Sequence, residues 1–266
     1  MVNSLWLMVY GYVGSVYRLY NGLKMKNRVE EFVKGKAHES WHTILVEALL
    51  KLDSNYLEYI LSEEYIPSNG RLFSAFKTLP KKKVKYILFG QDPYPRKESA
   101  TGYAFIDGAV ESIFSENGLS KAVNRATSLR NFTKMALVAK GLLDRDNTSK
   151  EAIAKIDKNA LIESIYELKD NFEKNGVLLL NTALIFESKE QSNYHIKMWK
   201  PFIKHLLENI DTQTTLILFG NPAKKIKKDF MPKQRCIELE HPYNVSFITS
   251  GVALELFGGM KLYDKV

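Results

Sequence analysis

A five-residue loop carries the side chains best suited to chemistry in this sequence. The segment Gly90-Gln91-Asp92-Pro93-Tyr94 follows an apolar run, residues 84–89, that has the composition of a buried strand. A carboxylate, an amide and a phenol are therefore expected on the loop that leaves this strand. In open α/β sheets, ligands bind at the carboxyl ends of the strands. The loop is thus the first candidate for a binding or catalytic site.

Three more strands are expected to end in polar residues or glycine. Apolar runs cover residues 177–180, 215–219 and 236–239, and they are followed by Asn181, by Gly220 and, after Glu240, by His241. When parallel strands lie in one sheet, their carboxyl ends meet at the same edge. We therefore expect Asp92, Asn181 and His241 to be neighbours despite their separation along the chain.

Helical periodicity fills the intervals between these strands. Apolar residues recur at helical spacing over 41–61, and helices are expected over roughly 119–140, 150–174, 199–210 and 221–229. Continuous apolar strands that alternate with helices are typical of a parallel sheet covered on both faces. The predicted fold class is α/β, a three-layer sandwich with a central, mainly parallel four-stranded sheet flanked by helices.

Composition and charge narrow the class of protein. Hydrophobic residues make up 45% of the 266 residues, which is enough for a substantial core, and the formal net charge is +8. A basic balance favours an acidic partner, of which nucleic acid is the commonest, although a charge that only aids solubility has the same composition. The single cysteine, Cys236, allows no intrachain disulfide and no multi-cysteine zinc site. Since a phosphate-binding glycine loop is missing as well, we expect no metal and no organic cofactor.

The first 24 residues differ from the rest of the chain. Their apolar segment, residues 5–14, is too short to span a bilayer as a helix, and no basic residue precedes it as in a secretory signal. Two hypotheses remain: an organellar presequence, or a true start at Met25 preceded by an upstream extension. The expected organisation is an N-terminal extension over 1–24 and a single catalytic domain over 25–266.

The residues at the expected strand ends belong to a longer series of motifs that resembles the family 1 uracil-DNA glycosylases. The series runs in order along the chain: Ser40-Trp41-His42, Gly90 to Tyr94, Gly102-Tyr103-Ala104-Phe105, Ser128-Leu129-Arg130-Asn131, Leu178-Leu179-Leu180-Asn181-Thr182, Leu218-Phe219-Gly220-Asn221 with Ala223 and Lys225, and His241-Pro242 with Ser246. Single pieces are weak signals, whereas their joint order and spacing are specific. The resemblance implies a uracil-DNA glycosylase-like fold and the cleavage of uracil from deoxyribose.

Two residues are expected to be catalytic. Cleavage develops an oxocarbenium-like sugar and a uracil anion, and each charge needs a preorganised partner. We expect Asp92 to orient and deprotonate water and to stabilise the sugar cation, while a neutral His241 donates a hydrogen bond to the uracil oxygen. The ordinary alternatives are an aspartate that caps a turn before Pro93 and a solvated histidine before Pro242. His195 lies near a serine-and-histidine loop of the resembled family without matching its pattern.

Four residues are expected to bind the base. Asn181 offers a donor and an acceptor complementary to uracil O4 and N3–H, which rejects cytosine. Phe105 is expected to stack on the flipped base, with a core phenylalanine as the alternative. Tyr94 fills the space beside C5, where a thymine methyl would clash, and Gln91 belongs to the same substrate-binding loop.

The DNA-binding loops depart most from the resembled family. Ser128 and Ser246 are expected to contact phosphates, and Val245 stands where the family has a leucine that enters the vacated base position. Valine is shorter, so support for base flipping is expected to be weaker unless Tyr243 compensates. Four lysines near the third strand end are either a DNA-binding cluster or a solvated helix face: Lys224, Lys225, Lys227 and Lys228.

The sequence therefore predicts a monofunctional uracil-DNA glycosylase that leaves an abasic site in single- or double-stranded DNA and so initiates base excision repair. Two alternatives stay open: a DNA-binding accessory or processivity protein on the same fold, and a glycosylase for another damaged base. We expect a monomer without membrane association that is cytoplasmic, or nuclear or organellar in a eukaryote.

Overall fold

A parallel four-stranded sheet forms the centre of the molecule. The computed structural model describes residues 20–62, 64–68 and 70–265. The strands are β1 (Tyr86–Gly90), β4 (Val177–Asn181), β5 (Thr215–Phe219) and β6 (Arg235–Leu239), in the order β4-β1-β5-β6. All three pairings are parallel, which confirms the α/β class and the four expected strands. A hairpin of β2 (Phe114–Ser115) and β3 (Gly118–Leu119) lies outside this sheet.

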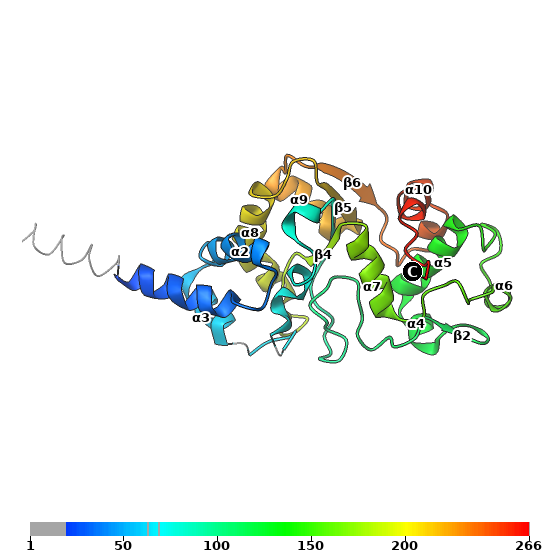
Figure 1. Cartoon of the computed structure of the whole chain (residues 1–266), viewed down its shortest axis with the longest axis horizontal. Coiled ribbons are helices and arrows are strands. Elements are labelled where there is room, and N and C mark those ends of the chain that lie inside the picture. Colours follow the sequence, from blue (N-terminus) through cyan, green and yellow to red (C-terminus); the bar gives the residue numbers. More distant parts are fainter. Residues whose placement is uncertain (1–19, 63, 69, 266) are drawn as a thin grey trace, which may run out of the picture.

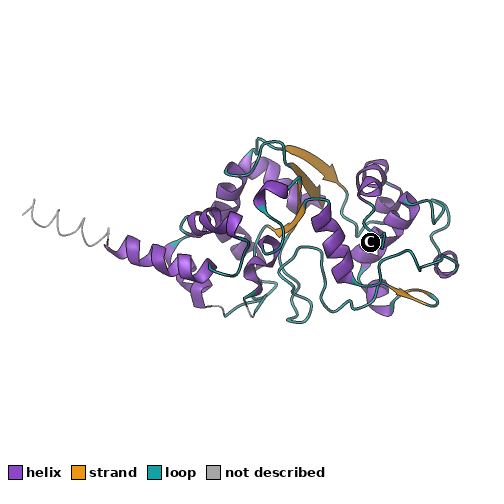
Figure 2. Cartoon of the chain, viewed as in Figure 1, coloured by secondary structure: helices purple, strands orange, loops and turns teal. Residues whose placement is uncertain are grey.

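Helices cover both faces of the sheet, so the three expected layers are present (Figure 1, Figure 2). The first layer contains α2 (His42–Leu49), α3 (Ser54–Ser62), α8 (Ser192–Glu208) and α9 (Gly220–Phe230). The second layer contains α5 (Thr127–Ala139), α7 (Ile165–Lys174) and α10 (Gly251–Met260). Ile87 and Phe89 pack against the first layer and Leu88 against the second. This alternation explains why a strand buried on both faces is apolar throughout.

Three of the expected helical stretches are each divided into two helices, and the first two are divided by local contacts or backbone geometry. The pattern over 41–61 is split into α2 and α3, because the Asp53 carboxylate accepts the N–H groups of Asn55 and Tyr56 at 3.0 and 3.2 Å and so starts a new helix. The pattern over 119–140 is split into α4 (Lys121–Arg125) and α5 by Ala126, whose φ of −88° and ψ of 83° are not helical. The helix expected over 221–229 is confirmed as α9.

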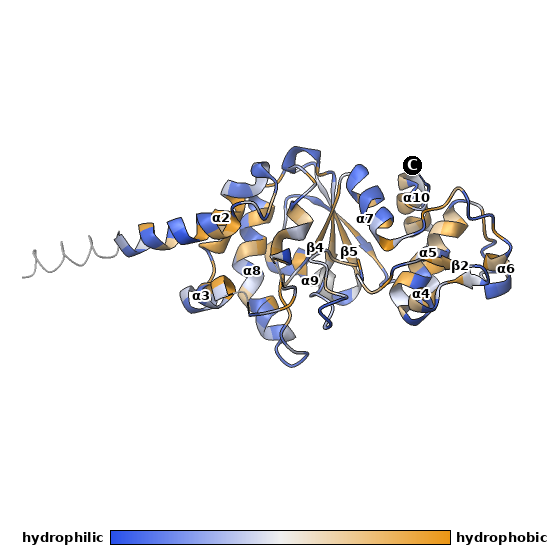
Figure 3. Ribbon diagram, turned by 60° about the horizontal axis from the view of Figure 1, so that its bottom comes forward, coloured by the Kyte–Doolittle hydropathy of each residue, from blue (hydrophilic) through white to orange (hydrophobic). Residues whose placement is uncertain are grey.

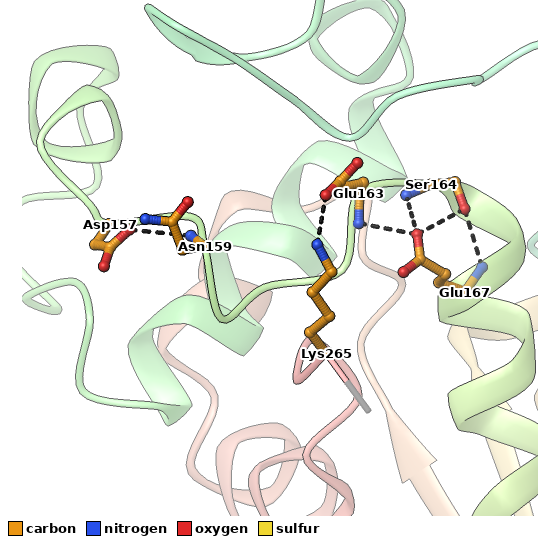
Figure 4. Close-up of polar contacts among 6 residues, drawn as sticks. All are labelled: Asp157, Asn159, Glu163, Ser164, Glu167 and Lys265. Atoms are coloured by element: carbon orange, nitrogen blue, oxygen red, sulfur yellow. Dashed lines mark hydrogen bonds and ion pairs between the residues drawn. The ribbon is translucent and has the colours of Figure 1, made fainter.

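The prediction of one continuous helix over 150–174 is wrong for the middle of that range. α6 (Lys150–Ala154) and α7 are separate, and local polar contacts hold the chain before α7 (Figure 4). The Ser164 hydroxyl accepts the Glu167 N–H at 3.2 Å, and the Glu167 carboxylate accepts the Ser164 N–H at 2.9 Å. This reciprocal arrangement is a capping box, which begins a helix rather than continuing one.

The N-terminal helix joins the first layer. Residues 20–33 are helical, and Val29 and Val33 are buried in the core of that layer. The expected boundary at Met25 falls within this helix, and residues 1–19 lie outside the described part of the chain. Short 3-10 helices complete the fold: η1 (Glu39–Trp41), η2 (Arg71–Phe76), η3 (Lys81–Lys83) and η4 (Val245–Thr249). Within the described residues, no helix combines the length and apolar character needed to cross a membrane.

Candidate active site

The carboxyl ends of the strands surround a cavity of about 250 Å³. The chain runs from β1 to β4 and then crosses back over β1 to β5, so the connections diverge between β1 and β5. Ligand clefts form at such points in open α/β sheets. Seven of the nine expected site residues line this cavity: Gln91, Asp92, Tyr94, Phe105, Ser128, Asn181 and His241.

Asn181 is fixed against the end of β1. Gly90 and Asn181 are register partners, and a Cβ on Gly90 would lie 2.3 Å from the Asn181 Oδ1 atom. Only glycine therefore allows the amide to lie across the strand end. The Thr182 N–H extends the pairing by donating to the Gly90 carbonyl at 3.0 Å. Because Asn181 is also buried, its amide is held in one place and can present a donor and an acceptor to a ligand.

Aromatic side chains form two walls of the cavity. The Phe105 ring meets Phe132 edge-on at 4.9 Å between centroids and lies 6.3 Å from Phe219, so it belongs to both the core and the cavity. Its φ of 69° is uncommon for a residue other than glycine, and such conformations cluster at functional sites. Burial, with a smaller contribution from Asp107, raises the pKa of the Tyr94 phenol. The phenol is therefore a bulky and uncharged wall.

The tautomer of His241 follows from a backbone contact. The Tyr243 N–H donates to His241 Nδ1 at 3.1 Å, so in the neutral ring the proton is on Nε2. Loss of water around the ring lowers the pKa of His241, which favours this neutral form. Gly220, at a φ of +61°, allows close packing, because a Cβ there would lie 3.0 Å from the His241 Cβ. His241 can therefore act as a neutral hydrogen-bond donor.

Asn131 holds the loop that carries His241. Its buried amide nitrogen donates to the carbonyls of Pro242 at 2.8 Å and Tyr243 at 3.1 Å. Asn131 lies on α5, three residues after Ser128, which lines the cavity. One helix thus contributes to the cavity wall and fixes the opposite loop. The motif Ser128-Leu129-Arg130-Asn131 marks this segment in the sequence, but by itself it predicts a role only for its serine.

Ser192, which sequence reasoning missed, contacts the candidate catalytic carboxylate. The Ser192 hydroxyl donates to Asp92 Oδ2 and accepts a hydrogen bond from Gln91 Nε2 at 3.4 Å. Ser192 is buried at the start of α8, where the positive end of the helix dipole also favours a carboxylate. The contact engages one of the two carboxylate oxygens, Oδ2. Apolar periodicity predicts the start of this helix only at 199, which leaves Ser192 outside the predicted helix.

His195 lies one turn further along α8 and does not line the cavity. Its Nδ1 is 2.8 Å from the Tyr56 hydroxyl, and its Nε2 is 3.3 Å from the Glu187 carboxylate. Burial lowers the pKa of His195. These contacts connect α8 to α3, which is a structural role. Among the described residues, no group of three or more histidine, cysteine, aspartate or glutamate side chains has the arrangement of a metal site.

The two remaining expected residues, Val245 and Ser246, lie outside the cavity in η4. The Ser246 hydroxyl donates to the Glu240 carboxylate. The Val245 side chain is 71% exposed, and Tyr243 on the same loop is 66% exposed. The loop after His241 therefore presents apolar side chains to solvent, and its contacts with DNA stay predictions.

Known proteins are similar to this chain in sequence and in structure. The family model of the uracil DNA glycosylase superfamily matches residues 76–257. The uracil-DNA glycosylase of Borreliella burgdorferi (strain ZS7) is 27% identical over 222 residues, which cover 79% of this chain and 85% of that protein. The wild-type UNG crystal structure from Nitratifractor salsuginis matches with a TM-score of 0.87 at 52% identity, and the match covers 90% of this chain and 98% of that chain. The chain belongs to the uracil DNA glycosylase superfamily.

Proposed function

We propose that this protein excises uracil from DNA by hydrolysing the N-glycosidic bond, which leaves an abasic site and starts base excision repair. The observation that carries the proposal is the cavity, where the Asp92 carboxylate, the His241 imidazole and the Asn181 amide meet between aromatic walls. The similarity to a curated uracil-DNA glycosylase and to the UNG structure supports the same activity.

Asp92 acts on the sugar side of the bond. A water molecule held by its free carboxylate oxygen attacks C1′ while the bond between C1′ and uracil N1 breaks, and the water proton passes to the carboxylate. The electron pair of the broken bond leaves with uracil. Before the attack is complete, the negative charge of Asp92 also stabilises the positive charge on the sugar.

His241 acts on the uracil side. The leaving base carries negative charge at O2, the oxygen beside N1, and an Nε2–H donor stabilises that charge. The hydrogen bond from the Tyr243 N–H to Nδ1 favours the tautomer that has this donor. One such donor is typically worth about 10²–10³ in rate.

Three side chains select the base. The fixed amide of Asn181 pairs with uracil O4 and N3–H and presents the wrong pattern to cytosine. The neutral Tyr94 phenol occupies the space that a thymine methyl needs. Phe105 stacks on the flipped base, and Gln91 closes the cavity beside Asp92, where its amide contacts Ser192.

The exposed loops bind the DNA backbone and support base flipping. Ser128 and Ser246 contact phosphates of the DNA, and Val245 enters the space that the base leaves. Flipping costs a few kcal/mol, least for single-stranded or mispaired bases, so both strand forms are substrates. The protein acts as a cytoplasmic monomer through one catalytic domain, residues 25–266.

The test is the release of uracil from labelled single- and double-stranded oligonucleotides that contain one deoxyuridine. The wild type should release uracil, while Asp92→Asn and His241→Ala should each lose at least about 100-fold in rate and keep their circular dichroism spectra. Asp146→Asn, an exposed loop aspartate, is the matched control. Full activity in Asp92→Asn would contradict the mechanism. Release of hypoxanthine or mispaired thymine in preference to uracil would contradict the substrate, and DNA binding without excision would favour an accessory role.

A further inference from the structure

A second cavity, of about 300 Å³, lies between α8 and α9 and belongs to none of the roles described above. Its lining joins the two helices to the loops at the ends of β1 and β4: Gln91, Thr182, Asn193, Ile196, Lys197, Lys200, Ile203, Lys225, Ile226, Asp229 and Phe230. Gln91 lines this groove and also the active-site cavity. The α8–α9 groove is therefore adjacent to the active-site cavity. Figure 3 shows the two helices beside the central strands.

The α8–α9 groove combines an apolar floor with an excess of positive charge. Ile203 and Ile226 are buried, whereas the Phe230 ring is partly exposed. Three lysines line the groove against one carboxylate, and that carboxylate, on Asp229, is 2.5 Å from Lys200 Nζ. Two cations, on facing helices, are left in excess.

Those two cations are Lys197 on α8 and Lys225 on α9. Both side chains are exposed, and neither has an ion pair with another residue in the described part of the chain. Lys227, by contrast, pairs with Glu238 at 2.9 Å. The basic sequence over 224–228 is thus divided: Lys227 is neutralised on the helix surface, while Lys225 lines the groove.

We propose that the α8–α9 groove binds the single-stranded DNA that continues from the flipped nucleotide, with phosphates at Lys197 and Lys225 and one unstacked base against Phe230. The inference rests on the proposed glycosylase function. A positively charged groove with an aromatic side chain is the arrangement by which proteins hold single strands without reading their sequence. A strand that leaves the active-site cavity past Gln91 enters this groove directly. The site therefore favours uracil in single-stranded DNA, where the neighbouring base is free to leave the stack.

The test compares the pair Lys197→Gln/Lys225→Gln with a charge-matched pair, Lys81→Gln/Lys82→Gln. The control lysines lie in η3, before the amino end of β1 and so at the opposite edge of the sheet from the active site. Three single-stranded substrates carry one deoxyuridine each, with nucleotides on both sides, on the 5′ side only or on the 3′ side only. The measured quantity is kcat/KM for uracil release as a function of salt.

Loss of two phosphate contacts should reduce the slope of log kcat/KM against log salt by about 1.4, at about 0.7 per phosphate for single strands. In the Lys197→Gln/Lys225→Gln pair, kcat/KM should fall for one of the two one-sided substrates and stay unchanged for the other. The value of kcat should be unchanged for all three substrates. Phe230→Ala should lower kcat/KM for the same substrates by roughly 5-fold or more.

Two results would overturn the inference. One is a groove pair that behaves like the η3 pair at every salt concentration; the other is a loss that is equal for both one-sided substrates. A wild type that releases no uracil would instead refute the proposed function, so the two failures are distinguishable. Thermal melts of both lysine pairs check that a loss of kcat/KM does not come from unfolding.

Discussion

Replacing Ser192 with alanine removes one hydroxyl from beside the candidate catalytic carboxylate. In the folded protein this hydroxyl donates to Asp92 Oδ2 and accepts from Gln91 Nε2 at 3.4 Å. Because the amide already donates to Ser192, and an ionised carboxylate can only accept, the serine proton must point at Asp92. In the proposed mechanism the hydroxyl therefore fixes which carboxylate oxygen faces the attacking water. Alanine at 192 leaves the carboxylate free to rotate.

The expected loss can be estimated from the kind of bond. Hydrogen bonds to charged groups contribute about 1.5–3 kcal/mol. Asp92 is only partly buried, so water can replace the serine, and the lower value applies. About 1.5 kcal/mol corresponds to roughly tenfold in rate. The loss should appear in kcat, with KM unchanged, because the contact orients the carboxylate and does not touch the base.

The assay is single-turnover release of uracil by the wild type, Ser192→Ala, Asp92→Asn and the double variant. If Ser192 acts through the carboxylate, its removal should cost about tenfold in the wild-type background and little in the Asp92→Asn background. Ser164→Ala is the matched control, because it removes a serine hydroxyl from the start of α7, where that hydroxyl caps the helix. It should cost about 1 kcal/mol of stability without loss of rate. Wild-type kcat in Ser192→Ala, or an equal loss in both backgrounds, would refute the reasoning.

The same geometry sets the outcome of three other perturbations. Gly90→Ala places a Cβ 2.3 Å from Asn181 Oδ1, so uracil release should fall roughly 100-fold and the preference over cytosine should weaken in a competition assay; an unchanged preference would contradict the role of Asn181. Because burial lowers the pKa of His195 and His241, the unfolded chain binds more protons, and the free energy of unfolding should fall as the pH drops through about 6.5. Thermal melts should show a smaller pH dependence in His195→Gln, and an unaltered slope would show that His195 does not contribute. Val245→Leu lengthens the exposed side chain expected to enter the duplex, so it should raise excision from double-stranded DNA relative to single-stranded DNA, and an equal change on both would refute that assignment.

The strands were predictable for a physical reason. A parallel strand buried on both faces has a continuous apolar sequence. The ends of the four observed strands lie within two residues of the ends of the apolar runs at 84–89, 177–180, 215–219 and 236–239. Since their carboxyl ends share one edge, the neighbourhood of Asp92, Asn181 and His241 followed from the strands alone.

Helix limits and supporting contacts were not predictable in the same way. A helix begins where a side chain such as Asp53 or Ser164 accepts hydrogen bonds from the backbone N–H groups of the first turn. The periodicity of apolar residues carries no information about that contact. Ser192 and Asp92 are 100 residues apart in sequence, and Asn131 and Pro242 are 111 apart. Nothing local in the chain marks such pairs, so they emerge only from the packing of helices on the sheet.

These two long-range contacts come from opposite layers of the molecule. Asp92 is held by Ser192 on α8, in the first layer, and the His241 loop is held by Asn131 on α5, in the second. In the proposed mechanism the carboxylate and the imidazole act on the two ends of one breaking bond, so the distance between them has to be kept. With the sheet between the layers, that separation is set by the core packing on both faces. Local opening of either layer should therefore abolish excision before the sheet itself unfolds.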